Sequence, residues 1–203
     1  MKFIKRLLKL SMLHIKKQEN TENNMNKDKI TLAKKTLKLL ETQSWEEIKF
    51  SSIVSNSKNK IIKNKSEALI NINLYFDFLL KKNLSNLEKS SKKDMIFEVI
   101  MARLDILNAH RRSIENVIKY LQYNPQEFLK LLPTLIETII LMATLSNIKV
   151  NNLKGVINIK GLFVLYILII FTWRKDTTQG LEKTMTTLDN YLINIDKFFK
   201  YLK

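Results

Sequence analysis

Apolar residues recur three or four positions apart along most of this chain, and that spacing is the strongest constraint on its fold. Near the C-terminus the pattern is clearest in Leu181, Met185, Leu188 and Leu192, which fall on one face of a helix. Only 3 Gly and 2 Pro occur among 203 residues, too few for the turns of a hairpin-rich protein. The sequence therefore predicts an all-α fold in which several helices are joined by short loops.

The same periodicity gives approximate bounds for the helices. We expect a short helical segment over 48–54 and longer helices over 28–42, 66–83, 91–107, 114–121, 125–140, 153–175 and 178–202. Asp28 and Ser66 are the predicted N-caps of their helices, and Asp176, followed by two threonines, is the predicted N-cap of the last helix. Pro133 lies too far inside its helix to belong to a cap, so we expect a kink or a break there.

The N-terminal segment differs in character from the rest of the chain. Residues 1–17 carry Lys and Arg, with no acidic residue before Glu19, and place several apolar residues on one helical side; residues 18–28 are polar and resemble a linker. Three interpretations stay open. The segment is a helix on a membrane surface, an import-type presequence, or an artefact of a true start at Met25, which would leave the first 24 residues out of the protein.

The most apolar stretch covers residues 161–172 and is bounded by Lys160 on one side and by Arg174 and Lys175 on the other. A helix of that length measures about 18 Å, whereas the hydrocarbon core of a bilayer is about 30 Å thick. The stretch alone is therefore too short to cross a membrane. Because a helix that is apolar all round is usually covered on every side, we expect either the central helix of the domain or half of a dimer interface.

The net charge of +16 also has two interpretations. In the first, the lysines form an ordinary solvated surface. In the second, part of the excess marks a patch that faces nucleic acid or an anionic membrane. Only five of the 35 basic residues are Arg, and Lys, Asn and Ile are the residues that an AT-biased coding sequence encodes, so part of this charge is expected to reflect coding bias.

Side chains that carry catalysis or bind metals are also scarce. The chain has no Cys and two His, His14 and His110, and no acidic residue joins a His in a metal-binding spacing. The sequence has no glycine-rich loop that would hold a phosphate and no Ser or Lys in a recognisable nucleophile setting. We therefore expect a protein that is not an enzyme and that uses neither a metal nor a cofactor.

Three segments, taken in order, resemble one family. The first covers residues 28–80, with Trp45, Ile53 and the run Ser66–Leu69 that opens a long helix; it resembles the helix-turn-helix domain of tetracycline-repressor (TetR) type regulators. The second covers 94–111 and the third 173–192. Both are similar to an alphaproteobacterial branch of that superfamily, related to the ubiquinone-biosynthesis accessory proteins of the coenzyme-Q-nine family. The resemblance covers residues 28–195.

This resemblance implies a TetR-like domain plan. Residues 1–27 would be a basic extension and linker, 28–83 a degenerate helix-turn-helix domain, and 91–203 a helical domain for ligand binding and dimerisation. Proteins of the coenzyme-Q-nine family keep the TetR fold but bind lipid. We therefore expect a cytoplasmic homodimer, joined through residues 153–202, that touches the membrane surface and assists an enzyme of ubiquinone biosynthesis.

The lipid implied by the resemblance is an isoprenoid quinone intermediate or an acyl chain. The alternative for the apolar residues of this region is an ordinary close-packed core. The expected lining residues are Leu135, Ile139, Met142, Phe163, Tyr166, Ile167, Ile170 and Phe171.

The alternative function is that of a TetR-type transcriptional repressor, which binds DNA as a dimer. It requires a recognition helix over 57–64, yet Lys58 stands where the family's turn has Gly, and the next helix begins about five residues early. Lys58, Lys60, Lys63 and Lys65 would then either hold phosphates, which gives affinity without sequence readout, or form a solvated loop. Because the recognition helix departs from the family pattern, we favour the lipid-binding function.

Overall fold

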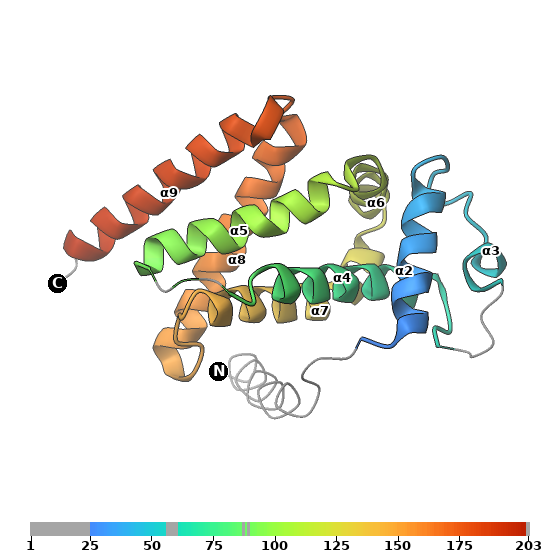
Figure 1. The fold of residues 1–203 in the computed structure, drawn as a ribbon, viewed down its shortest axis with the longest axis horizontal. Coiled ribbons are helices and arrows are strands. Elements are labelled where there is room, and N and C mark those ends of the chain that lie inside the picture. Colours follow the sequence, from blue (N-terminus) through green and yellow to red (C-terminus); the bar gives the residue numbers. More distant parts are fainter. Residues whose placement is uncertain (1–24, 56–60, 87, 89, 202–203) are drawn as a thin grey trace. The chain divides into compact units, whose positions relative to one another are not determined.

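A computed structural model describes residues 25–55, 61–86, 88 and 90–201 of the chain. This part consists of eight α-helices and one short 3-10 helix and contains no strand (Figure 1), so the prediction of an all-α fold is confirmed. The basic segment 1–17 lies outside the described residues. Helix labels follow Figure 1 and begin at α2. The elements are α2 (Lys27–Leu40), α3 (Phe50–Val54), α4 (Lys65–Asn83), α5 (Lys92–Asn108), α6 (Arg111–Tyr123), α7 (Pro125–Leu145), α8 (Asn152–Lys175), η1 (Gln179–Leu181) and α9 (Glu182–Tyr201).

The described residues form two compact units, each assembled from segments that are distant in sequence. Unit 1 contains the described residues of Asn83–Leu104 and Ile139–Lys203, and unit 2 contains those of Asn20–Lys82 and Asp105–Thr138. The boundaries fall inside α5 and α7, so each of these helices contributes to both units. The domains expected from the resemblance are continuous stretches, whereas the structure groups residues 105–138 with the N-terminal helices.

In unit 2, α2 packs against α6, and polar side chains of α6 close the C-terminal end of α2. The hydroxyl of Ser113 donates a hydrogen bond to the carbonyl of Leu37 at 2.8 Å, and the amide of Asn116 donates one to the carbonyl of Leu40 at 2.7 Å. The last carbonyls of a helix lack the donors that the following turn would supply. Glu41 donates its amide to the Leu37 carbonyl at 3.2 Å, so Ser113 adds a second donor there, whereas Asn116 supplies a donor to the carbonyl of Leu40, the last residue of α2.

Trp45 anchors the turn between α2 and α3. Its side chain is 2% exposed, and its ring meets that of Tyr120 edge-on, with 6.3 Å between the ring centroids. Ile48 and Ile53 are buried with it. A helix as short as α3 is unstable in isolation, so its conformation depends on burying Ile53, which contributes about 1.5–3 kcal/mol for a side chain of this size.

The predicted start of α2 is correct to within one residue, but its cap is a different residue. The N-cap is Asn26, whose Oδ1 accepts a hydrogen bond from the amide of Asp28 at 2.9 Å. Asp28, predicted as the cap, lies in the first turn, where a negative charge still favours the helix dipole. At α5 the predicted start is correct, because the Ser91 hydroxyl accepts a hydrogen bond from the amide of Asp94 at 3.2 Å.

The residue that caps α4 also differs from the predicted one. Asn64 accepts a hydrogen bond from the amide of Glu67 at 2.9 Å, and the Glu67 carboxylate accepts one from the amide of Lys63 at 2.7 Å. This pair resembles a capping box, except that the Glu67 carboxylate accepts from the residue before the cap and not from the cap itself. The prediction of Ser66 as the cap is wrong, since its hydroxyl donates to the carboxylate of Glu127 at 2.6 Å.

Helix α7 continues through Pro133, so the predicted break is not found. Proline has no amide hydrogen, and the carbonyl of Leu129, four residues earlier, therefore lacks its usual donor. Both Leu129 and Pro133 are exposed on α7. Water can reach the carbonyl on that side of the helix, which explains why the helix tolerates the proline.

In unit 1, Asp176 organises the corner between α8 and α9 (Figure 1), but it is not the N-cap of α9. It ends α8, and its carboxylate accepts hydrogen bonds from the amide and hydroxyl of Thr178 at 2.9 and 2.5 Å and from those of Thr184, both at 2.7 Å. Gly180, with φ of 77°, makes the turn between them. Asp176 therefore accepts a hydrogen bond from the amide of Thr184, in the first turn of α9, although Asp176 itself lies before that helix begins.

Candidate functional site

Seven of the eight residues expected to line a lipid site belong to unit 1, on the C-terminal part of α7 and on α8. Ile139 and Met142 are 1% and 0% exposed. Tyr166 is 7% exposed and Phe171 is 51% exposed. Leu135 is partly exposed and belongs to unit 2. The residues of intermediate burial are Phe163, Ile167 and Ile170. The seven residues of unit 1 therefore range from its interior to its surface.

Helix α8 is covered on one side only. The buried side chains are Leu162, Leu165, Tyr166, Ile169 and Trp173. The opposite side exposes five large apolar side chains, Leu153 (70% exposed), Ile157 (60%), Val164 (57%), Leu168 (43%) and Phe171 (51%). The expectation of a central helix covered on every side is therefore wrong, and the other interpretation of this segment, half of a dimer interface, stays a prediction.

Two lysines, Lys160 and Lys175, are exposed on the same side of α8 as these five apolar residues. Helical geometry, at 3.6 residues per turn, places all seven on one narrow band. We call this band the α8 stripe. It consists of Leu153, Ile157, Lys160, Val164, Leu168, Phe171 and Lys175.

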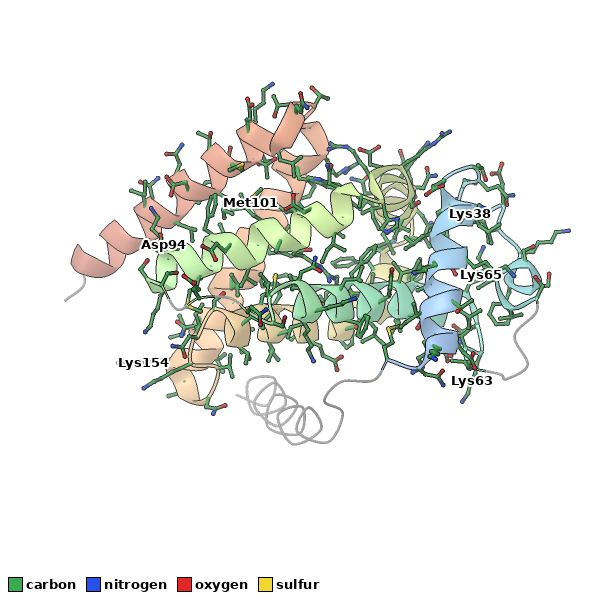
Figure 2. The ribbon with its side chains drawn as sticks, in the orientation of Figure 1. Lys38, Lys63, Lys65, Asp94, Met101 and Lys154 are labelled. Atoms are coloured by element: carbon green, nitrogen blue, oxygen red, sulfur yellow. The ribbon has the colours of Figure 1, made fainter. Side chains whose placement is uncertain are left out.

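The charged residues in and around α8 are all positive. From residue 138 to residue 175 the chain has no Asp or Glu, and its charged residues are Lys149, Lys154, Lys160, Arg174 and Lys175. Figure 2 shows Lys154 at the start of α8, with its side chain pointing away from the helix. Exposed hydrocarbon combined with positive charge favours contact with anionic lipid or with another protein surface.

A buried polar cluster in unit 2 was not expected from the sequence. It joins Asn73 and Asp77 on α4 to Thr134 and Thr138 on α7, and all four residues are at most 8% exposed. The amide of Asn73 donates to the Thr138 hydroxyl at 2.8 Å, and that hydroxyl donates to Asp77 at 2.9 Å. The available signal was the spacing of four within each pair, which places polar residues together on an otherwise apolar helix face.

His110 is the histidine that lies in the described part of the chain. Its ring stacks on Phe76 with 5.7 Å between the ring centroids. Burial lowers the pKa of the imidazole, against a smaller opposing effect of Glu41. Among the described residues, no group of three or more His, Cys, Asp or Glu side chains is placed to hold a metal ion.

Of the four lysines considered for DNA contact, Lys58 and Lys60 lie outside the described residues. Lys63 is exposed, whereas Lys65 is engaged within unit 2 (Figure 2). The Lys65 ammonium donates to the carbonyl of Trp45 at 2.5 Å and lies 4.8 Å from the centroid of its ring. Burial lowers the pKa of Lys65, although the nearby negative charge of Glu46 raises it. The cation is therefore directed at the tryptophan that anchors the turn after α2.

The segment expected to form a recognition helix, residues 57–64, is described only from residue 61 onward. Residues 61–64 have no helical conformation, and α4 begins at Lys65. Asn64 in this segment caps α4, as described above. The described end of the expected recognition helix, residues 61–64, is therefore not helical.

By length and composition alone, two helices of the described part, Pro125–Leu145 and Leu153–Lys175, are long and apolar enough to cross a membrane. The core helix of a protein outside the membrane passes the same test, so these helices are weak evidence. The expected cytoplasmic location with contact to the membrane surface stays a prediction.

No protein-family model matches the chain, and no curated protein matches it. The TetR-like family inferred from the three sequence segments therefore stays a prediction.

Proposed function

We propose that this protein binds lipid without catalysing a reaction, and that its ligand is an isoprenoid quinone intermediate or an acyl chain used in ubiquinone biosynthesis. The observation that carries the proposal is the acid-free stretch 138–175, which spans the end of α7 and all of α8. A hydrocarbon ligand requires walls without buried charge, because an unpaired carboxylate or ammonium beside it is costly. This stretch offers such walls over two consecutive helices.

The graded burial of the expected lining residues also supports the proposal. Ile139 and Met142 are fully buried, whereas Phe171 on α8 is about half exposed. A ligand that enters from a membrane needs apolar side chains at the surface as well as in the interior. Met142 adds flexibility, because its unbranched thioether adapts to ligands of irregular shape.

The positive charge around α8 suits a protein that collects its ligand at a membrane surface. Lys154 and Lys160 are exposed on α8, and Lys175 is exposed at its end. Each lysine near an anionic bilayer contributes about 1 kcal/mol of attraction. We propose that this attraction holds the protein at the cytoplasmic surface, where an enzyme of ubiquinone biosynthesis would receive the ligand.

The direct test is lipid uptake. Protein freed of lipid would be mixed with vesicles that contain a prenylated quinone, separated from them, and extracted for analysis. We expect quinone in the protein fraction, and several-fold less in the variant Ile170→Trp, whose larger side chain would occupy the ligand's space. Leu129→Trp is the matched control, since Leu129 is 63% exposed on α7 in unit 2. No uptake by the unmodified protein would contradict the proposal.

The TetR-type repressor is the second candidate. The non-helical residues 61–64 and the engagement of Lys65 with Trp45 weigh against it. A gel-shift titration with salt separates the two functions. DNA binding that disappears at moderate salt and has no sequence preference reflects charge alone, whereas salt-resistant, sequence-dependent binding would favour the repressor.

A further inference from the structure

His110 lies at the corner between α5 and α6 in unit 2, and its backbone takes part in both helix ends. Its amide donates a hydrogen bond to the carbonyl of Leu107 at 3.0 Å, at the end of α5. Its carbonyl accepts one from the amide of Ile114, also at 3.0 Å, in the first turn of α6. A displacement of His110 would therefore disturb the start of α6 directly.

The imidazole ring of His110 is packed in a way that suits only its neutral form. The ring stacks on Phe76 of α4, with 5.7 Å between the ring centroids and 21° between the ring planes. Its Nδ1 atom is buried, and no described residue offers this atom a hydrogen-bond partner. A charged imidazole carries a hydrogen on both nitrogens. Protonation would therefore leave a buried N–H without an acceptor, which is costly.

The charged groups around this corner do not supply the missing acceptor. Glu41, just after α2, raises the pKa of His110, but burial has the larger effect and lowers it. Glu115 on α6 is paired with Arg111 at 3.0 Å, and the carboxylate of Asp77 on α4 accepts hydrogen bonds from α7. The exposed charged residues nearest to the corner along α5 and α6 are Asp105 and Arg112.

From this packing we infer that His110 is a pH-sensitive switch that holds α6 against α2 at neutral pH and releases it in acid. Protonation would drive the ring from Phe76 toward water, and the start of α6 would move with it. Ser113 and Asn116, which donate to carbonyls at the end of α2, lie within two turns of His110 on α6. Their hydrogen bonds would then be lost together. This inference concerns unit 2 and does not depend on the proposed lipid ligand in unit 1.

The direction of the pH effect follows from the burial of the ring. The pKa of an ordinary histidine is about 6.5, and burial lowers the pKa of His110 in the folded protein. As the pH falls, the unfolded chain therefore takes up its proton before the folded protein does. The stability contributed by the neutral ring is complete above about pH 6.5 and is lost as the pH falls from there through the folded pKa. The switch would thus respond to mild acid.

NMR titration of the ring is the first test. The chain has two histidines, so His14→Gln leaves the signals of His110 alone in the spectrum. We expect these signals to titrate with a midpoint below the ordinary value of about 6.5. A midpoint at or above that value would show that Phe76 and Glu41 favour the charged ring, and the inference would be overturned.

Hydrogen exchange then tests whether the proton releases α6. His110→Phe keeps an aromatic ring beside Phe76 but cannot take up a proton. Over α6 and the end of α2, the ratio of protection in the unmodified protein to that in the variant should fall about tenfold between pH 7.5 and pH 5. Over α8, in unit 1, this ratio should stay constant. His110→Gln, which is smaller and also neutral, should give the same result if phenylalanine fits poorly. A ratio that is constant over α6, or that falls equally over α8, would contradict the inference.

Discussion

The carboxylate of Asp176 accepts two hydrogen bonds from Thr184, one from its amide and one from its hydroxyl, both at 2.7 Å. Thr184 lies in the first turn of α9, and Asp176 ends α8 and is 1% exposed. One buried carboxylate at the end of α8 therefore accepts hydrogen bonds from the first turn of α9. The direction in which α9 leaves α8, and with it the environment of the α8 stripe, depends on this pair.

Replacing this carboxylate should destabilise unit 1. Asp176→Asn keeps the size of the side chain but removes the charge, and the amide nitrogen cannot accept the bonds that an oxygen accepts. Hydrogen bonds to charged groups contribute roughly 1.5–3 kcal/mol each, so a loss of about 3 kcal/mol is expected in urea unfolding. Asp189→Asn is the control, since Asp189 forms a partly exposed ion pair with Lys93 at 2.8 Å that is worth at most about 1 kcal/mol. Equal losses would contradict the assigned role.

The same carboxylate predicts how stability depends on pH. Burial raises the pKa of Asp176, but its four hydrogen bonds outweigh burial and hold the pKa far below the ordinary value. A carboxyl group with a lowered pKa in the folded state adds stability above its unfolded pKa of about 3.9, and this stability is lost as the pH falls below that value. The gap in unfolding free energy between the unmodified protein and Asp176→Asn should therefore narrow from about pH 6 to about pH 3. A constant gap would count against the assignment.

Two glycines of α8 should respond in opposite directions to alanine. A Cβ on Gly155 would lie 2.3 Å from the carbonyl carbon of Val150, whereas a Cβ on Gly161 would meet no atom within 4 Å. Gly155→Ala should therefore cost about 1–3 kcal/mol through overpacking, and Gly161→Ala should gain about 0.5–1 kcal/mol through helix propensity. Thermal unfolding of both variants tests this; similar shifts would show that the start of α8 does not pack closely on the preceding loop.

Because Lys65 contacts Trp45, its replacement should destabilise the protein, which the replacement of a solvated lysine would not do. Lys65→Met keeps the stem but removes both the hydrogen bond to the Trp45 carbonyl and the cation over its ring. We expect a loss of about 1–2 kcal/mol in unfolding free energy and a change in the fluorescence of the folded protein. Lys63→Met, at an exposed position two residues away, should change neither. If both variants behave alike, Lys65 is not held by Trp45.

The helices were predictable because their apolar periodicity is regular. The expected bounds of α2, α5 and α8 agree with the structure to within two residues, since burial of one face dominates their formation. The capping residues were less predictable. Asn26 and Asp28 are both suitable caps by residue type, and only the backbone conformation decides between them. Asp176 and Thr184 are eight positions apart, so their contact depends on the turn at Gly180, which periodicity does not describe.

For the candidate site, the sequence predicted which residues it contains and which helices carry them, but not which side chains are buried. The acid-free stretch and its apolar residues are visible in the sequence, and so is their assignment to α7 and α8. Which side of α8 is covered depends on what packs against it, and this follows from tertiary structure alone. Leu153 and Ile157 illustrate the point, because both are apolar and yet are 70% and 60% exposed. The buried cluster of Asn73, Asp77 and Thr138 needed the pairing of α4 with α7, which local sequence does not determine.

We propose above that unit 1 holds a lipid. Native mass spectrometry of the protein purified without detergent tests it most directly, because a bound lipid adds a discrete mass that dissociates on activation. We expect a population carrying a hydrophobic ligand that organic extraction identifies as a prenylated quinone or an acyl lipid. A spectrum that contains only the polypeptide mass, from protein that also takes up no prenylated quinone from vesicles, would contradict it.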